Sequence, residues 1–199
     1  PDPLLIHYAD LLKGEGLALD LAAGTCHTSV QLARLGHQVV ALDCSLTALQ
    51  IGQRIAAREG VRIQGLVADL DNWPLPQSTF EVITCFRYLN RELFPAMGNA
   101  LKPGGLLLYK TFNQHHLREV PRFNPNYLLR PGELARSFPD LELIVAADND
   151  HRTPGNPGIT KATEAAQIVG GGGVWPQRCG DDCACTDFND VANCRRANQ

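Results

Sequence analysis

Short apolar runs alternate with longer amphipathic runs over residues 17–111. The short runs are rich in Leu, Val and Ile, which is typical of strands buried on both faces of a parallel sheet, and the longer runs are typical of the helices that cover it. The predicted strands span residues 17–21, 38–42, 62–67, 81–85 and 106–111. The pattern therefore predicts an α/β fold with a doubly wound, mostly parallel sheet.

Glycine, proline and hydroxyl side chains mark where the helices between these strands begin and end. Helices are predicted over residues 28–35, 45–60, 90–101 and 132–138. The second begins at Ser45, a residue type that caps helices well. The first two end at Gly36 and Gly60, because glycine adopts the left-handed conformation that closes many helices. The third ends before LKPGG, where Pro103 cannot continue a helix and the paired glycines allow a sharp turn.

A long loop and then a hairpin are predicted after the fifth strand. Residues 114–129 are polar and aromatic and are interrupted by prolines, which indicates an extended loop, and long loops in compact domains are commonly functional. Residues 141–148 form an apolar run, and residues 165–169 form another after the turn-rich HRTPGNPG. These two runs predict an antiparallel C-terminal hairpin that completes a seven-stranded sheet.

Composition indicates an ordinary globular protein. The chain has 199 residues, 44% of them hydrophobic, and a formal net charge of −3, which suits a single domain. It has no apolar run of about 18 residues and no basic-then-apolar start, so we expect no membrane span and a cytoplasmic location. The negative charge and the lack of a basic stripe with aromatic residues argue against a nucleic-acid partner. A monomer or a homodimer is expected.

The seven cysteines fall into two groups. Cys26, Cys44 and Cys85 lie within or beside apolar segments, which is typical of free thiols that pack as small hydrophobes. The other four lie in the Gly- and Cys-rich stretch 170–199, which we expect to be a flexible appendage to a domain of residues 1–169. No pair of CxxC units occurs there, so no metal site is predicted.

The stretch LDLAAGTCHTS, residues 19–29, has the pattern of a cofactor loop. An apolar strand with a carboxylate is followed by a turn of small residues and the start of a helix, where unpaired N–H groups point toward a polar ligand. The dinucleotide fingerprint G-x-G-x-x-G would require glycine at positions 22, 24 and 27, where the chain has Ala22, Gly24 and His27. A nicotinamide oxidoreductase is therefore the less favoured interpretation.

Two further carboxylates follow at the ends of predicted strands. Asp43 lies 23 positions after Asp20, in ALDCS, close to the spacing expected for a carboxylate that accepts from ribose hydroxyls. A capping role for Asp43 is less favoured, because Ser45 already supplies the cap. Asp69 ends the third strand, in VADLDNWP, where its side chain is suited to accept from an adenine amino group.

Five segments in this order resemble the motif series of class I S-adenosylmethionine-dependent methyltransferases. They are LDLAAGTCHTS, ALDCS, VADLDNWPLP, FEVITCFRYLN and LKPGGLLLYKTF. The resemblance covers residues 1–148, and PRFNPNYLLRPGELARSFPDLELI further resembles small bacterial tellurite-resistance-type and related small-molecule methyltransferases. It implies a Rossmann-like fold, S-adenosylmethionine as cofactor and methyl transfer to a small molecule.

The resemblance also implies a set of cofactor-binding residues. Asp20 and the Ala22–Gly24 backbone would face the methionine part, Asp43 the ribose, and Asp69 the adenine. The full set is Asp20, Ala22, Ala23, Gly24, Asp43, Cys44, Asp69, Leu70, Cys85 and Phe86, the last two beside the sulfonium and the methyl group. Cys26 stands where the family usually has glycine, and two consequences are open: the thiol crowds the ligand or it weakens binding. PDPLLIHYADLL resembles the family's lid helix, with His7 and Tyr8 as cofactor contacts.

Cationic and polar side chains follow the fourth and fifth strands and line the long loop. They are Arg87, Tyr88, Arg91, Lys110, Asn113, His115, His116, Arg122, Tyr127 and Arg130. Because guanidinium groups match carboxylates and oxyanions, this concentration predicts an anionic or oxyanion methyl acceptor. Arg87, Tyr88 and His115 are the predicted catalytic residues, with a histidine as base near neutral pH. A degenerate domain that serves as an interaction module remains an alternative, favoured by Ala22 and Cys26.

Overall fold

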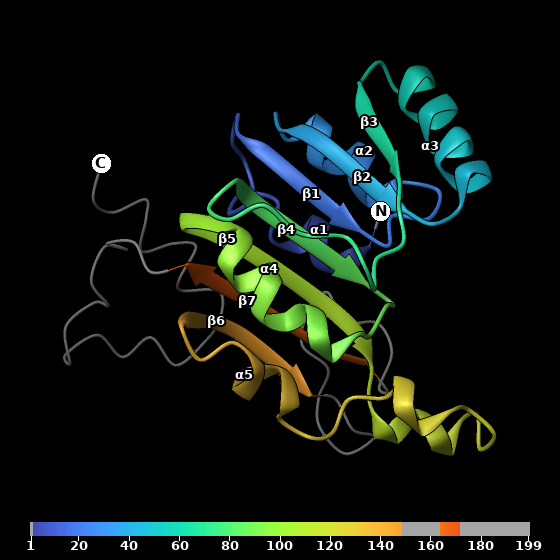
Figure 1. The fold of residues 1–199 in the computed structure, drawn as a ribbon, viewed down its shortest axis with the longest axis vertical. Helices are drawn as coiled ribbons and strands as arrows, with labels where there is room; N and C mark the ends of the chain where they lie inside the picture. The colour runs from blue at the N-terminus through green and yellow to red at the C-terminus, as the bar shows by residue number, and fades with distance from the viewer. Residues whose placement is uncertain (1, 149–163, 172–199) are drawn as a thin grey trace.

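The computed structural model describes residues 2–148 and 164–171, in which seven strands form one sheet in the order β3-β2-β1-β4-β5-β7-β6. The strands are β1 (Leu17–Leu21), β2 (Gln38–Asp43), β3 (Ile63–Val67), β4 (Phe80–Phe86), β5 (Leu101–Phe112), β6 (Leu141–Asp148) and β7 (Glu164–Gly171). The first five are all parallel, so their carboxyl ends meet along one edge (Figure 1). The predicted α/β fold with a parallel sheet is confirmed.

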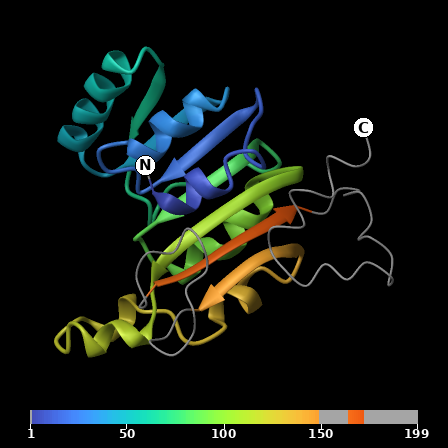
Figure 2. The same ribbon diagram turned by 180° about the vertical axis from the view of Figure 1, so that it is seen from behind.

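Helices cover both faces of this sheet. They are α1 (Pro3–His7), α2 (His27–Arg34), α3 (Leu46–Arg58), α4 (Phe94–Ala100) and α5 (Glu133–Ser137), with 3-10 turns η1 (Arg91–Leu93), η2 (Gln114–Arg118) and η3 (Pro125–Tyr127). In Figure 1, α4 and α5 lie in front of the sheet, and Figure 2, seen from behind, brings α1 and α2 to the front. The two turns η2 and η3 lie within the long loop predicted over residues 114–129.

Alternate side chains of the central strand belong to different layers of the core. Ala18 packs in the cluster that contains Leu5 and Leu32 of α1 and α2, whereas Leu19 packs in the cluster that contains Phe94 and Met97 of α4. Successive side chains of a strand point to opposite faces, so a strand covered on both faces must be apolar at successive positions. This explains why the central strands read as continuous apolar runs.

Two expected helix boundaries hold, and one expected helix is wrong in detail. The Ser45 Oγ accepts from the Ala48 N–H at 3.2 Å, and Gly36 closes the turn after α2 with φ of +107°. The helix predicted over residues 90–101 is instead the 3-10 turn η1 followed by α4. Pro95 explains the division, because it has no N–H to donate to the carbonyl of Arg91.

The segment LKPGG was predicted to be a turn before the fifth strand, and it is part of that strand. Leu101 pairs with Phe80 of β4, and the next pair is Leu106 with Val82, so the register shifts between them. Residues 102–105 of β5 stand opposite the single residue Glu81 of β4, and Gly104 adopts φ of +79° among them. The segment therefore behaves as an irregularity inside a long strand rather than as a separate turn.

Strands β6 and β7 lie beyond β5 in the sheet. β7 pairs antiparallel with β5, with Leu107 opposite Val169, and β6 pairs antiparallel with β7, with Leu143 again opposite Val169. β7 ends at Gly171, inside the stretch expected to be an appendage. Residues 149–163 and 172–199, which include the four C-terminal cysteines, lie outside the described residues.

The start of α2 packs tightly against α3 through Cys26 and Gly52. The Cys26 side chain is buried in a small cluster with Ala41 and Leu49. A Cβ atom added at Gly52 would lie 2.3 Å from the Cys26 Sγ and 2.6 Å from its Cβ. The two helices can approach this closely only because position 52 has no side chain.

We expect Gly52→Ala to lower the free energy of unfolding by about 1–3 kcal/mol, because the new methyl group overlaps the Cys26 side chain. Urea denaturation of the purified protein measures this. In the Cys26→Gly background the same change should cost clearly less, since the overlapping atoms are gone.

Gly98→Ala in α4 is the matched control, because a Cβ atom there meets nothing within 4 Å. Equal effects of Gly52→Ala with and without Cys26 would show that the two positions are not coupled.

Candidate functional site

The loop after β1 is built from alternating left-handed residues. Ala22, Gly24 and Cys26 have φ of +55°, +53° and +59°, a region in which residues with a Cβ atom are uncommon. The Ala23 N–H donates to the carbonyl of Leu42 at 3.0 Å, and the Cys26 N–H donates to the carbonyl of Ala23 at 2.8 Å. A Cβ atom added at Gly24 would meet nothing within 4 Å. The loop is therefore a compact turn whose Gly24 side is open to an approaching ligand.

The Cys26 side chain lies in the core of the protein. Its side chain is fully buried and packs between the start of α2 and Gly52 of α3. Burial raises the pKa of the Cys26 thiol to about 11, so the thiol remains neutral at physiological pH. Cys26 thus occupies a glycine-like backbone conformation with its side chain turned into the core.

Asp43 joins the ends of β1 and β2. Its Oδ2 accepts from the Gly24 N–H at 2.8 Å, and its Oδ1 accepts from the Ser45 N–H at 2.8 Å. An ionised carboxylate has about four acceptor positions, so these two bonds leave capacity for hydroxyl donors from a ligand. The carboxylate is half-buried at the carboxyl edge of the sheet, and the neighbouring Cys44 is exposed.

Asp20 was expected to face the methionine part of the cofactor, and the structure buries it between β1, α2 and β4. Its Oδ2 accepts from the Ser29 Oγ at 2.5 Å, and its Oδ1 accepts from the Thr84 Oγ1 at 2.8 Å. Only 2% of Asp20 is exposed. Burial raises its pKa from near 3.8 to about 6, although both hydroxyl bonds oppose the rise. The side chain joins three elements beneath the loop.

The segment after β3 forms a tight turn at the same edge. Asp69 is exposed, and its Oδ1 accepts from the Asp71 N–H at 3.1 Å while its Oδ2 accepts from the Asn72 Nδ2 at 2.8 Å. Leu70 is buried among the core residues near α4. Leu70 thus fixes the turn to the core, and the Asp69 carboxylate lies at the surface.

The end of β4 holds Cys85, Phe86, Arg87 and Tyr88. Burial raises the pKa of the Cys85 thiol to about 12, so it is neutral. Phe86 packs against Leu4 of α1. Arg87 is exposed, has φ of +60°, and its N–H donates to the carbonyl of Lys110 at 2.7 Å. The backbone bond holds Arg87 at the edge where the loops meet.

Several predicted acceptor residues have partners within the chain. Arg91 donates to both carboxylate oxygens of Glu133, at 2.5 and 3.0 Å, and to the carbonyls of Asn126 and Leu128, both at 2.9 Å. Lys110 is 1% exposed and donates to both carboxylate oxygens of Asp2 at 3.1 Å. These two cations support the fold around the site, which weakens the case for an acceptor pocket lined by many cations.

The predicted bases differ in their surroundings. His116 is buried and stacks on Phe112, with ring centroids 4.3 Å apart. Its Nδ1 lies 3.6 Å from the Glu119 carboxylate. His115 is half-buried, and its backbone N–H donates to the Asn113 Oδ1 at 3.0 Å. His115 therefore remains the better candidate of the two.

The N-terminal helix lies across the end of β4 and β5. Asp2 caps α1 by accepting from the Leu4 N–H at 2.9 Å, and the same carboxylate pairs with Lys110. Leu4 and Leu5 are buried, His7 is exposed, and Tyr8 packs near Phe86.

Sequence reasoning missed Asp2, Asp71 and Glu133, because their partners are distant in the chain and nothing in the sequence marks such pairs.

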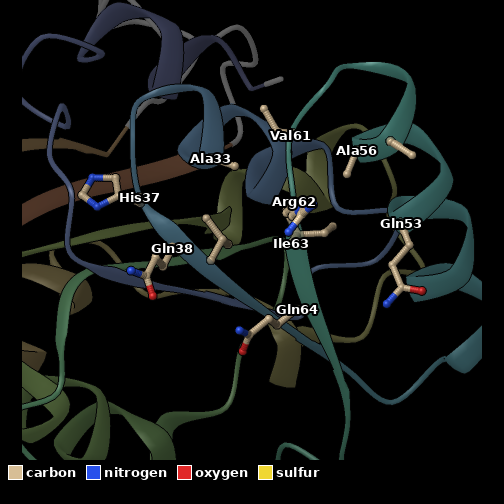
Figure 3. A pocket seen from close by; sticks show the side chains of 11 residues that line it. Ala33, His37, Gln38, Gln53, Ala56, Val61, Arg62, Ile63 and Gln64 are labelled. Atoms are coloured by element: carbon tan, nitrogen blue, oxygen red, sulfur yellow. The ribbon is translucent and has the colours of Figure 1, made fainter.

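A cavity of about 600 Å³ lies at the opposite end of the sheet. It is lined by residues of α2 and α3, the first residues of β2 and β3, and the residues just before these strands, including His37, Gln53 and Gln64 (Figure 3). The His37 Nε2 lies 2.6 Å from the carbonyl oxygen of Leu12. The candidate cofactor residues lie at the carboxyl ends of the same strands, so this cavity is not their site.

Within residues 2–148 and 164–171, no group of three His, Cys, Asp or Glu side chains is arranged to hold a metal ion. A search of the same ranges finds no helix with the length and apolar character needed to cross a membrane.

Comparison with known proteins finds similarity to methyltransferases. Residues 18–105 match the family described as the methyltransferase domain. The chain is 35% identical over 100 residues to a demethylmenaquinone methyltransferase of Clavibacter sepedonicus, a match that covers 48% of this chain and 40% of the relative. It is 26% identical over 157 residues to a ubiquinone biosynthesis O-methyltransferase of Xanthomonas axonopodis pv. citri (strain 306), covering 67% of this chain and 66% of the relative. The chain thus spans less than two thirds of the length of either relative.

Solved structures share the fold. TehB from Haemophilus influenzae superposes with a TM-score of 0.67 at 20% identity, covering 84% of this chain and 61% of TehB. Solved S-adenosylmethionine-dependent methyltransferases superpose similarly. The chain thus matches a methyltransferase domain over residues 18–105 and has the fold of S-adenosylmethionine-dependent methyltransferases. The open side of Gly24 and the remaining acceptor capacity of Asp43 fit a ligand with a polar part and hydroxyl groups, such as S-adenosylmethionine.

The raised pKa of Asp20 predicts a pH-dependent stability. Because the carboxyl takes up its proton at a higher pH in the folded state than in the unfolded state, the folded state binds more protons between about pH 4 and pH 6. The free energy of unfolding should therefore fall as the pH rises through this window, by up to about 3 kcal/mol.

Urea denaturation of the wild type and Asp20→Asn at pH 4.5, 6 and 7.5 measures this contribution, since asparagine does not titrate. The gap between the two proteins should change with pH, whereas the exposed Asp140→Asn control should not reproduce that change. Parallel curves for wild type and Asp20→Asn would contradict the assignment.

Proposed function

We propose that this protein transfers a methyl group from S-adenosylmethionine to an oxygen atom of a small molecule by in-line displacement. The observation that carries the proposal is the loop after β1, where the open side of Gly24 adjoins the Asp43 carboxylate that binds its N–H at 2.8 Å. A carboxylate at this position can also accept from ribose hydroxyls.

The chain's own residues would mainly bind and orient. When bound, S-adenosylmethionine supplies a methyl group already activated by the sulfonium, so the protein's main task is to position and desolvate the acceptor. The Ala22–Gly24 backbone and Asp20 beneath it would hold the methionine part, Asp43 and Cys44 the ribose, and Asp69 with Leu70 the adenine. Cys85 would lie beside the transferred group as an uncharged thiol.

The acceptor is proposed to be an anion or an oxyanion held by Arg87. Arg87 is exposed at the carboxyl edge, and its backbone is bonded to β5. An oxygen acceptor is supported by the relative named as an O-methyltransferase. A hydroxyl oxygen attacks carbon best after losing its proton, so such an acceptor needs a base. His115 would accept that proton, because an imidazole nitrogen is a common general base and this side chain is half-buried beside the end of β5.

The extent of the domain, its compartment and its oligomeric state form part of the proposed function. Residues 1–169 would form the methyltransferase domain, with β6 and β7 as the antiparallel pair that completes its seven-stranded sheet. Among the described residues, Cys26, Cys44 and Cys85 are free thiols, which suits the reducing cytoplasm. A monomer or homodimer acting on a small molecule is proposed. The degenerate-domain alternative loses the support of Cys26, because that thiol is accommodated in the core.

Isothermal titration of the protein with S-adenosylmethionine, S-adenosylhomocysteine and NADH tests the donor site. We expect binding of the first two and none of NADH. Asp43→Ala should weaken binding by on the order of 1–3 kcal/mol, because ligand hydroxyls lose their acceptor and Gly24 loses its partner.

The exposed Asp140→Ala is the matched control and should bind like the wild type. Unchanged affinity in Asp43→Ala would restrict Asp43 to a role inside the loop, and binding of NADH alone would overturn the proposed cofactor use.

Arg87→Ala tests the acceptor. With hydroxybenzoates as probe acceptors, we expect KM to rise roughly tenfold while kcat changes little, because the guanidinium binds the carboxylate without taking part in the transfer. Uncharged phenols should show little difference between variant and wild type. The measurement is release of S-adenosylhomocysteine, with the exposed Arg58→Ala on α3 as control. An equal loss on charged and uncharged acceptors would remove Arg87 from acceptor recognition.

A further inference from the structure

The turn after β3 is joined to the end of β4 by a cluster of three side chains: Asp71, Tyr88 and Asn90. The Asp71 Oδ1 accepts from the Tyr88 hydroxyl at 2.7 Å and from the Asn90 Nδ2 at 2.7 Å. In the sheet, β3 and β4 are separated by β2 and β1, so this cluster connects segments whose strands are not neighbours.

The β4 side of this cluster is fixed to β5. The Tyr109 hydroxyl donates to the carbonyl of Tyr88 at 2.6 Å, and the Arg87 N–H donates to the carbonyl of Lys110 at 2.7 Å. Tyr109 and Lys110 are both fully buried. Hydrogen bonds to β5 therefore hold the backbone at Tyr88, and its hydroxyl binds the exposed Asp71 from this position.

The β3 side is a turn held by its own hydrogen bonds. Asp69 accepts from the Asp71 N–H through Oδ1 and from Asn72 through Oδ2, and its carbonyl accepts from the Asn72 N–H at 3.1 Å. Fixing Asp71 thus also fixes the Asp69 carboxylate two residues earlier. Hydrogen bonds thus connect Tyr88 to Asp71 and Asp71 to Asp69 without a break.

We propose that Asp71 is a positioning residue that holds Asp69 and Leu70 in the place where the donor's adenine would lie, by binding the Tyr88 hydroxyl at the end of β4. This inference rests on the proposed function, because it assigns a role in donor binding. It also gives Tyr88 a different role from the catalytic one first expected, since its proton is donated to Asp71. Burial and the Asp71 carboxylate both raise the pKa of Tyr88, which keeps that proton in place.

The bonding pattern distinguishes two substitutions at this position. Both donors bind the same oxygen, Oδ1, and the carbonyl oxygen of asparagine has two lone pairs that can accept both. Asp71→Asn should therefore keep the turn in place, whereas Asp71→Ala removes the acceptor. Tyr88→Phe removes the principal donor and should behave like Asp71→Ala.

Trp73 provides a readout that does not depend on donor binding. It lies two residues after Asp71, is 39% exposed, and becomes the sole tryptophan in a Trp175→Phe background. In that background, we expect Asp71→Ala and Tyr88→Phe to shift Trp73 emission to longer wavelength and to increase its quenching by acrylamide. Asp71→Asn and the Asp140→Ala control should leave both unchanged.

The same variants are then titrated with S-adenosylhomocysteine. We expect Asp71→Ala and Tyr88→Phe to bind roughly tenfold more weakly, with Asp71→Asn close to the starting protein. If the starting protein binds and Asp71→Ala binds equally well, the positioning role is overturned while the proposed function stands. Unchanged Trp73 emission and quenching in Asp71→Ala would also overturn it. If the starting protein does not bind, the proposed function fails and the donor role of Asp71 fails with it.

Discussion

The geometry of the site depends on how the chain turns from β1 into α2. Ala22, Gly24 and Cys26 all have left-handed backbone conformations, which cost energy wherever a Cβ atom is present. Bonds around the turn offset that cost: Asp43 binds the Gly24 N–H, and the carbonyl of Leu42 binds the Ala23 N–H. The loop is therefore held in one shape, with Gly24 open toward the ligand side.

Buried polar groups support this turn from below. Asp20 accepts from Ser29 of α2 and from Thr84 of β4, so one carboxylate joins the helix that follows the loop to the strand beside it. A buried carboxylate is costly unless its oxygens are satisfied, and both oxygens have a hydroxyl partner here. The residue that resembles a cofactor ligand in sequence thus also has a structural role in the fold.

Ion pairs and side-chain bonds organise the outer part of the site. Lys110 binds Asp2 and so holds α1 over the end of β5, while Arg91 binds Glu133 and two carbonyls of the long loop. These contacts use cations that the sequence suggested for an acceptor. Arg87, whose side chain is exposed, is the cation from that group on which the proposed acceptor site depends.

The amino-acid sequence by itself determined the parallel α/β architecture, the resemblance to methyltransferases and the position of the loop after β1. It could do so because apolar runs, glycine and proline positions and short motifs act locally, and Ser45 and Gly36 behave as their chemistry requires. Only the tertiary structure decided which polar side chains face one another. Asp71 meets Tyr88 and Asp2 meets Lys110 across long stretches of chain, and the direction of the Cys26 side chain depends on the missing side chain at Gly52. Such pairings follow from how strands and helices pack in space, which no local pattern in the chain records.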